Sequence, residues 1–120
     1  MKYSGWDYLD YMVQTCDELF ECMQDVSSAD ELEASVTKRR AVVMCLLDLG
    51  ELFKSLSAKE TGLFPSENWQ HIIGFRNRAS HGYHMLDFSI VYSIATNRVP
   101  PLYKFLKEQQ NLRGESNAQP

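Results

Sequence analysis

The apolar residues of the chain recur at steps of three and four positions, which places them on one face of an α-helix. This spacing predicts a first helix over residues 6–24, with Ser4 as its N-cap and Asp7 three positions later. A polar connection at residues 26–34, with room for one short helical turn, leads to a longer helix over residues 35–56. The apolar stripes of these two helices are Leu9, Met12, Val13, Cys16, Leu19, Phe20 and Met23, then Val42, Cys45, Leu46, Leu49, Phe53 and Leu56.

The second half of the chain repeats this pattern after a break in periodicity at residues 58–65. Ser66 is the predicted N-cap of a third helix. A fourth helix is predicted from Asp87 to Asn97, where the Pro100-Pro101 pair ends it, and a last short helix follows. No strand pattern is found. The sequence therefore predicts an all-α fold, an up-and-down antiparallel bundle of four main helices plus a short C-terminal helix.

The chain length of 120 residues suits one domain with a buried core. We expect a single helical domain at residues 1–110 and a disordered tail at residues 111–120. A hydrophobic content of 44% with 23% charged residues is typical of a globular protein. No run approaches the roughly 20 apolar residues that span a bilayer, and the first residues lack the apolar run of a signal peptide. A cytoplasmic protein is expected.

Three cysteines are present: Cys16, Cys22 and Cys45. Their odd number, and their positions inside amphipathic patterns without paired spacing, argue against disulfides and zinc. We expect buried, reduced thiols.

The net charge of −4 argues against a general nucleic-acid coat, which is normally basic. A local basic pocket is still possible on such a chain. The positive clusters are Lys38-Arg39-Arg40 and the pair Arg76 and Arg78. Any contact with RNA is expected near one of them, although Lys38-Arg39-Arg40 is also typical of a solvated helix face.

The segment at residues 76–83 carries the candidate chemistry of the chain. Arg76 offers a planar fork of donors that matches two phosphate oxygens, and His81 can exchange a proton near neutral pH. Asn77 and Tyr83 add an amide and a phenol as orienting groups. The combination suits a phosphodiester substrate. The spacing of Arg76 and His81 alone is also typical of surface ion pairing or helix C-capping.

On an unbroken helix, Arg76 and His81 would lie about 140° apart around the axis. We therefore expect either that the helix ends between them, with Gly82 as the break, or that two chains assemble. Metal-free RNA cleavage needs a base, an acid and positive charge on the phosphorane, and one histidine cannot act at both oxygens. A twofold dimer supplies two copies of each group, and this mechanism requires no cofactor.

A metal site is the alternative use of the histidines. His81 and His84 lie three positions apart and could bind a metal with Asp87 if the segment were helical. Without a further signature we expect no metal ion here. His71 is expected at the surface or at a contact between helices.

Other residues have expected structural roles. Gly50 lies inside a helical pattern, which suggests close approach of a neighbouring helix. Glu51 is a candidate ion-pair partner for a motif arginine, with an exposed carboxylate as the alternative. The aromatic residues expected in the core or at an interface, rather than as base-stacking platforms, are Trp69, Phe88, Tyr92, Tyr103 and Phe105.

Residues 69–83, WQHIIGFRNRASHGY, resemble the signature of the HepT-like proteins of the HEPN superfamily. That signature is W-x-x-I-x-G-x followed by R-N-x-x-x-H-x-Y. The resemblance extends to residues 40–42 and 49–52 upstream and to residues 87–102 downstream, and covers nearly the whole chain. Residues 59–66 match less clearly, which puts the rim of the cleft and the substrate in question.

The resemblance implies a helical bundle that dimerises with both motifs at a shared cleft. It implies a metal-independent endoribonuclease toxin of a prokaryotic toxin–antitoxin pair, silenced when a minimal nucleotidyltransferase antitoxin transfers AMP to the motif tyrosine. By position, Arg76 and His81 are similar to the family's catalytic residues, Asn77 and Arg78 to supporting ones, and Tyr83 to the AMP acceptor. The alternatives are a non-catalytic module that presents a nucleotide or substrate to a nucleotidyltransferase, and a purely structural partner.

Overall fold

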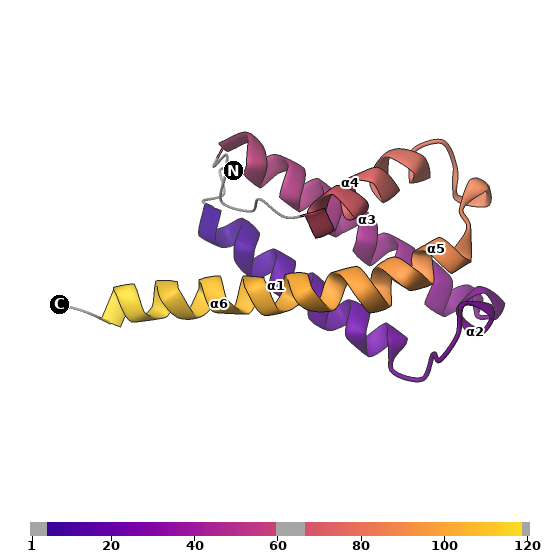
Figure 1. Cartoon of the computed structure of the whole chain (residues 1–120), viewed down its shortest axis with the longest axis horizontal. Coiled ribbons are helices and arrows are strands. Elements are labelled where there is room, and N and C mark those ends of the chain that lie inside the picture. Colours follow the sequence, from indigo (N-terminus) through magenta and orange to yellow (C-terminus); the bar gives the residue numbers. More distant parts are fainter. Residues whose placement is uncertain (1–4, 60–66, 119–120) are drawn as a thin grey trace.

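In the computed structural model the chain is described over residues 5–59 and 67–118, and this part contains helices and no strand. The successive long helices run in opposite directions (Figure 1), which confirms the predicted all-α antiparallel bundle. The predicted N-caps Ser4 and Ser66 lie outside the described residues. The elements are α1 (Gly5–Met23), α2 (Ala29–Ala34), α3 (Val36–Lys59), α4 (Glu67–Ala79), the 3-10 turn η1 (Tyr83–Met85), α5 (Phe88–Ser93), the π-helical turn η2 (Ile94–Arg98) and α6 (Val99–Ala118).

The core forms where α1 packs against α3, with α4 on α3 and α6 across α1. The Phe53 and Trp69 rings stack with their centroids 4.4 Å apart and join α3 to α4. Trp69 is buried, as predicted. No described helix is long and apolar enough to cross a bilayer. The largest fully buried side chains are Leu9, Met12, Leu19, Leu32, Leu46, Leu49, Trp69, Ile72, Phe75, Leu102 and Leu106.

The cysteines occupy the α1–α3 interface and its edge. Cys16 and Cys45 are buried, as expected, whereas Cys22 is half-buried. Burial, with smaller effects of nearby cysteines and acidic residues, raises the pKa of the Cys16 and Cys45 thiols to about 12. Both thiols are therefore protonated and unreactive at neutral pH.

The connection between α1 and α3 contains a complete short helix. Ser28 caps α2 by accepting a hydrogen bond from the Glu31 backbone N–H at 3.1 Å. The Glu31 carboxylate accepts in turn from the Ser27 backbone N–H at 2.9 Å. This hydrogen bond is the main reason why the pKa of Glu31 is lowered. Buried Leu32 anchors α2, which packs against α5. This anchoring fixes the position of α2 beside the start of α3.

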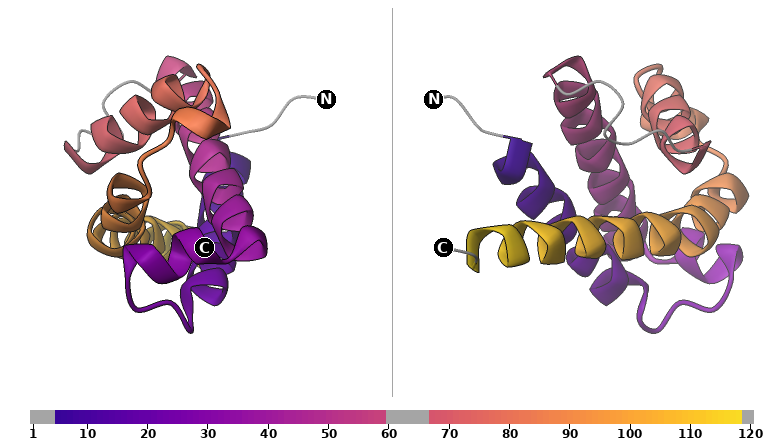
Figure 2. Two further views of the ribbon diagram at one scale, coloured as in Figure 1. Left: turned by 90° about the vertical axis from the view of Figure 1, so that its right-hand side faces the viewer. Right: turned by 60° about the vertical axis from the view of Figure 1, so that its left-hand side comes forward.

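The Pro100-Pro101 pair does not end a helix, and that prediction is wrong. Residues 88–118 form one continuous helix through α5, η2 and α6 (Figure 2). A π-helical turn lies directly before the prolines, and the Val99 backbone N–H donates to the Ile94 carbonyl five residues back. The clash of a proline ring with the carbonyl four residues earlier depends on α-helical geometry, from which this turn departs. A disordered tail was expected at residues 111–120, whereas the backbone is helical up to Ala118.

Candidate active site

The segment at residues 76–83 straddles the C-terminal end of α4. The helix ends at Ala79, and the His81 and Gly82 backbone N–H groups close the end by donating to the Arg78 and Ala79 carbonyls at 3.1 and 3.0 Å. Gly82 has a φ of 131°, a conformation that favours glycine. The prediction that the helix ends between Arg76 and His81, with Gly82 as the break, is confirmed.

Arg76 lies where α4 passes close to Gly50 of α3. A Cβ atom added at Gly50 would lie 3.1 Å from the Arg76 Cβ atom, tighter than ordinary van der Waals contact. The glycine therefore allows the backbone of α3 to come next to the Arg76 stem. The suggestion that Gly50 marks a close helix approach is confirmed.

Two side chains hold the Arg76 guanidinium. Its Nε donates to Glu51 Oε1 in an ion pair, which confirms the predicted partner, and its Nη1 donates to Asn77 Oδ1 at 3.3 Å. Burial, together with the charges of Glu18 and Glu51, raises the pKa of the neighbouring Asp48 carboxyl. Because Glu51 is 57% exposed, the ion pair contributes at most about 1 kcal/mol to stability. Its main effect is to orient the guanidinium.

The other motif arginine points elsewhere. Arg78 lies two positions after Arg76, about 200° around the helix. Its Nη1 lies 3.6 Å from a Cβ atom built at Gly74, so the side chain lies back along α4. Arg78 also lines an open hollow of about 230 Å³ with Gln70, His71 and Gly74. The structure thus separates Arg78 from Arg76 and does not bring both to one phosphate.

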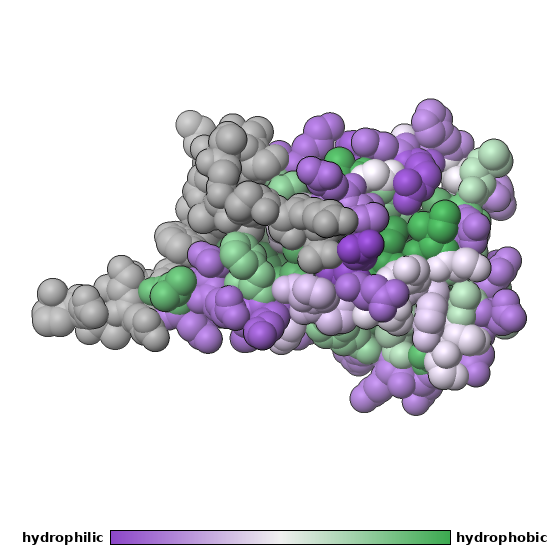
Figure 3. All heavy atoms as spheres, viewed as in Figure 1, coloured by the Kyte–Doolittle hydropathy of each residue, from purple (hydrophilic) through white to green (hydrophobic). Residues whose placement is uncertain are grey.

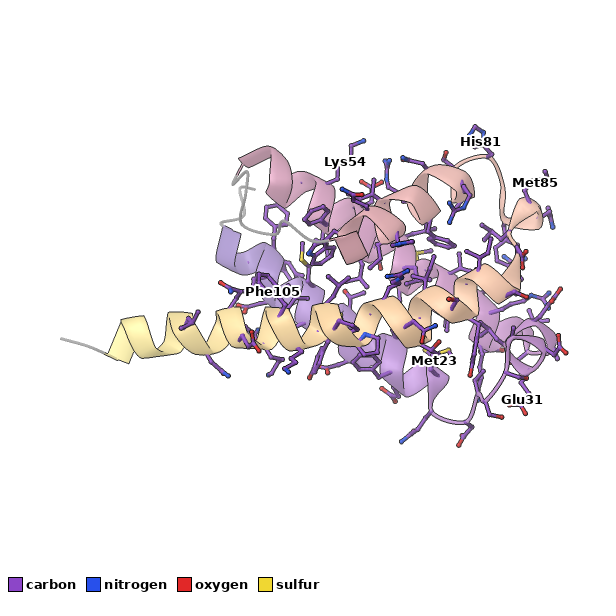
Figure 4. All side chains as sticks on the ribbon, in the orientation of Figure 1. Met23, Glu31, Lys54, His81, Met85 and Phe105 are labelled. Atoms are coloured by element: carbon purple, nitrogen blue, oxygen red, sulfur yellow. The ribbon has the colours of Figure 1, made fainter. Side chains whose placement is uncertain are left out.

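His81 lies in the turn after α4 and is exposed. Its side chain projects away from the ribbon (Figure 4). Among the described residues no hydrogen bond to its imidazole is present, so both ring nitrogens are available to a ligand. The imidazole does not contact Arg76 within the described chain.

Tyr83 is the most firmly held residue of the segment. Its Oη accepts a hydrogen bond from Arg39 Nε at 2.9 Å, and the Arg40 guanidinium carbon lies 4.5 Å from the ring centroid. The ring also meets the buried Phe88 edge-on at 6.0 Å. Arg39 Nη1 donates to the Glu33 carbonyl at 2.6 Å and so ties this group to α2. From the sequence these arginines were expected either on a solvated helix face or near RNA, and their contact with Tyr83 was not predicted.

The positions of the described side chains do not support a metal site formed by His81, His84 and Asp87. Asp87 caps α5, since its carboxylate accepts from the Ser89 backbone N–H at 2.8 Å. His71 and His84 are exposed. Within the described part of the chain no three His, Cys, Asp or Glu side chains are grouped to hold a metal ion.

Comparison with known proteins gives matches along most of the chain. A family model described as Ribonuclease HepT-like matches residues 12–109. A candidate RNase from Caldanaerobacter subterraneus subsp. tengcongensis is 29% identical over 101 residues, 84% of this chain and 89% of the relative. A candidate RNase from Methanocaldococcus jannaschii is 25% identical over 97 residues, 76% of this chain and 80% of the relative. No solved structure matches.

The contact at Gly50 yields a prediction about stability. Gly50→Ala should destabilise the protein by about 1 kcal/mol, because the clash with Arg76 outweighs the gain in helix propensity. The matched control is Gly74→Ala, whose new methyl group would meet only the flexible end of Arg78 at 3.6 Å. The control should be stabilised by up to about 1 kcal/mol. Urea unfolding measures both values, and equal stabilisation of the two variants would contradict the close approach.

Proposed function

The chain belongs to the HepT-like ribonuclease family and is thereby an endoribonuclease, and we propose that it cleaves RNA at one site shared by two copies of the chain. The separation of Arg76 from His81 within one chain supports this proposal. Arg76 is turned toward α3 by Glu51, whereas His81 projects from the turn beyond α4 (Figure 4). A twofold pair of chains places two imidazoles and two guanidiniums around one cleft.

In the proposed mechanism one His81 removes the proton of the RNA 2′-hydroxyl, and the 2′-oxygen attacks the adjacent phosphorus. The P–O5′ bond breaks, and His81 of the second copy protonates the leaving 5′-oxygen. Arg76 stabilises the charge of the phosphorane. Its Nε and Nη1 are engaged by Glu51 and Asn77, while no described acceptor is bonded to Nη2, which can donate to a phosphate oxygen. Arg78 has a supporting role from the other side of α4.

Exposed apolar side chains beside the motif support pairing with a second copy. Met85 is 78% exposed and Ile90 is 42% exposed. Both line a hollow of about 90 Å³ with Phe75 and Leu86. Apolar surface is visible between α4 and α5 with hydrophilic side chains around it (Figure 3). Methionine and other apolar residues are typical of the core of protein interfaces.

The surface of α3 between Glu51, which pairs with Arg76, and Arg40, which lies against Tyr83, also exposes an apolar side chain. Arg40, Met44, Leu47 and Glu51 follow at steps of four, three and four residues, so they share one helix face. Met44 on this face is 57% exposed. A second copy that covers this methionine would also lie next to Arg76 and Tyr83.

We place this ribonuclease in a toxin–antitoxin pair whose antitoxin is a minimal nucleotidyltransferase. In the proposed silencing reaction Tyr83 Oη forms a bond to the α-phosphorus of ATP. The bond from that phosphorus to the pyrophosphate oxygen breaks, pyrophosphate leaves, and the phenolic proton passes to a base of the antitoxin or to water. The hydrogen bond from Arg39 to Tyr83 Oη, beside an open hollow, supports this assignment. The alternative of a non-catalytic partner of the nucleotidyltransferase is less favoured, because the family is one of ribonucleases.

His81→Ala and Arg76→Ala should each lower the rate of RNA cleavage by a factor of about 100 or more, because each removes a group required at the phosphodiester. Both proteins should stay folded and dimeric. His71→Ala, which removes an exposed histidine from α4, is the control and should keep its activity. Single-turnover cleavage with added chelator gives the rates, and full activity of His81→Ala would refute its catalytic role.

Tyr83→Phe should abolish incorporation of AMP from labelled ATP in the presence of a nucleotidyltransferase antitoxin, because the acceptor oxygen is lost. Mass spectrometry of the wild-type protein should locate the added AMP on Tyr83. Tyr92→Phe, which removes the hydroxyl of a half-buried tyrosine on α5, is the control and should incorporate AMP normally. Normal incorporation by Tyr83→Phe would rule out this acceptor.

A further inference from the structure

Arg39 and Arg40 are consecutive residues of α3, yet both guanidiniums lie against Tyr83. Neighbouring positions on a helix point about 100° apart, so this convergence depends on the placement of η1 over the start of α3. Phe88 supports the Tyr83 ring from α5, and Arg39 is held to α2 through the Glu33 carbonyl. The two cations are therefore fixed in place by packing from three other elements.

The two positive charges lack neutralising partners. Within residues 5–59 and 67–118, neither Arg39 nor Arg40 forms an ion pair with a carboxylate. Arg39 Nε donates to the Tyr83 hydroxyl and Nη1 donates to the Glu33 backbone carbonyl, and both acceptors are neutral. The chain as a whole carries a net charge of −4, so a cluster of uncompensated cations is unusual on it. Such a cluster favours an anionic ligand.

The donors of Arg40 suit a phosphate group in particular. Its guanidinium lies over the Tyr83 ring, and no described group accepts a hydrogen bond from it. Stacking occupies one face of the guanidinium and leaves the N–H groups at its edges, which is the arrangement that binds two phosphate oxygens at once.

Space for a ligand lies beside Arg39 and Tyr83, which both line it, while Arg40 lies against the Tyr83 ring. An open hollow of about 220 Å³ is lined by Glu33, Arg39, Tyr83, His84, Leu86 and Phe88. The exposed His84 ring lies 6.0 Å from the Tyr83 ring and adds a polar aromatic surface. Glu33 is the one carboxylate among these lining residues, and its charge should weaken the binding of an anion.

We propose that Arg39 and Arg40 form, beside Tyr83, a binding site for the phosphate group of a nucleotide. Tyr83 follows His81 by two residues, so the site adjoins the proposed cleft. The phosphate comes either from the RNA strand next to the cleavage site or from a mononucleotide such as AMP. The inference rests on the proposed function, which makes RNA and AMP ligands of this surface.

The test measures binding separately from cleavage. A short single-stranded RNA with every 2′-hydroxyl methylated cannot be cleaved, and its affinity is measured by fluorescence anisotropy; AMP is titrated by calorimetry. Arg40→Ala should weaken the binding of at least one of these ligands about fivefold, as expected for the loss of one exposed charged contact. Arg39→Gln should have a similar effect, and Glu33→Gln should strengthen binding.

Lys107→Ala is the matched control, because it removes one exposed positive charge from α6. This helix runs from α5 toward the end of the molecule that lies opposite α2 (Figure 1). The affinity for RNA is measured over a range of salt concentrations. Weaker binding of RNA by Arg40→Ala, with the slope of log affinity against log salt concentration reduced in magnitude by about 0.7, identifies an RNA phosphate as the ligand. Weaker binding of AMP alone identifies a mononucleotide. An unchanged affinity for both ligands, or a loss equal to that of the control, would overturn the inference.

A parallel assay of RNA cleavage separates the two claims. If the wild-type protein cleaves RNA and Arg40→Ala binds both ligands normally, the phosphate site is wrong and the proposed function stands. If the wild-type protein cleaves no RNA but binds a ligand through Arg40, the phosphate site stands and the proposed function fails. Circular dichroism of each variant verifies that the fold is retained.

Discussion

The contact between Gly50 of α3 and Arg76 of α4 determines the arrangement of the candidate site. The absence of a side chain at Gly50 brings the two helices close enough for Arg76 to reach Glu51. This ion pair turns the guanidinium toward α3, while α4 continues for three more residues and ends at Ala79. His81 is consequently presented beyond the end of the helix, away from Arg76. The packing contact therefore orients the arginine, and the end of α4 at Ala79 separates it from the histidine.

Tyr83 forms a second fixed point at the start of α3. The short helix α2, capped by Ser28 and anchored by Leu32, holds the Glu33 carbonyl where Arg39 can reach it. Arg39 then bonds the Tyr83 hydroxyl. Residues 80–82 connect this rigid group to α4, so the turn that carries His81 is held from both sides.

Much of the bundle could be predicted from the sequence, because each helix forms from a pattern of neighbouring residues. The three- and four-residue spacing of apolar side chains reproduced α1 and α3 nearly to their ends, and the glycine inside α3 indicated the close approach. The break at the Pro100-Pro101 pair was predicted wrongly. Proline is expected to end a helix, and the π-helical turn that accommodates the pair has no recognised sequence signal.

The contacts of the candidate site were harder to predict because they depend on tertiary packing. Glu51 could be named as a partner for a motif arginine, since it follows the glycine that marks the contact. Arg39 and Tyr83 are 44 positions apart, and their hydrogen bond depends on the position of α2 and η1. The roles of Arg76, His81 and Tyr83 in catalysis and regulation stay predictions.

The central claim is that one cleavage site uses the histidines of two chains. A mixed dimer of one wild-type and one His81→Ala chain, isolated through two different affinity tags, tests it directly. If the two histidines act at the same phosphodiester, this dimer should cleave RNA at about one hundredth of the wild-type rate, because either the base or the acid is missing. Retention of half the wild-type rate would show two independent sites and contradict the account.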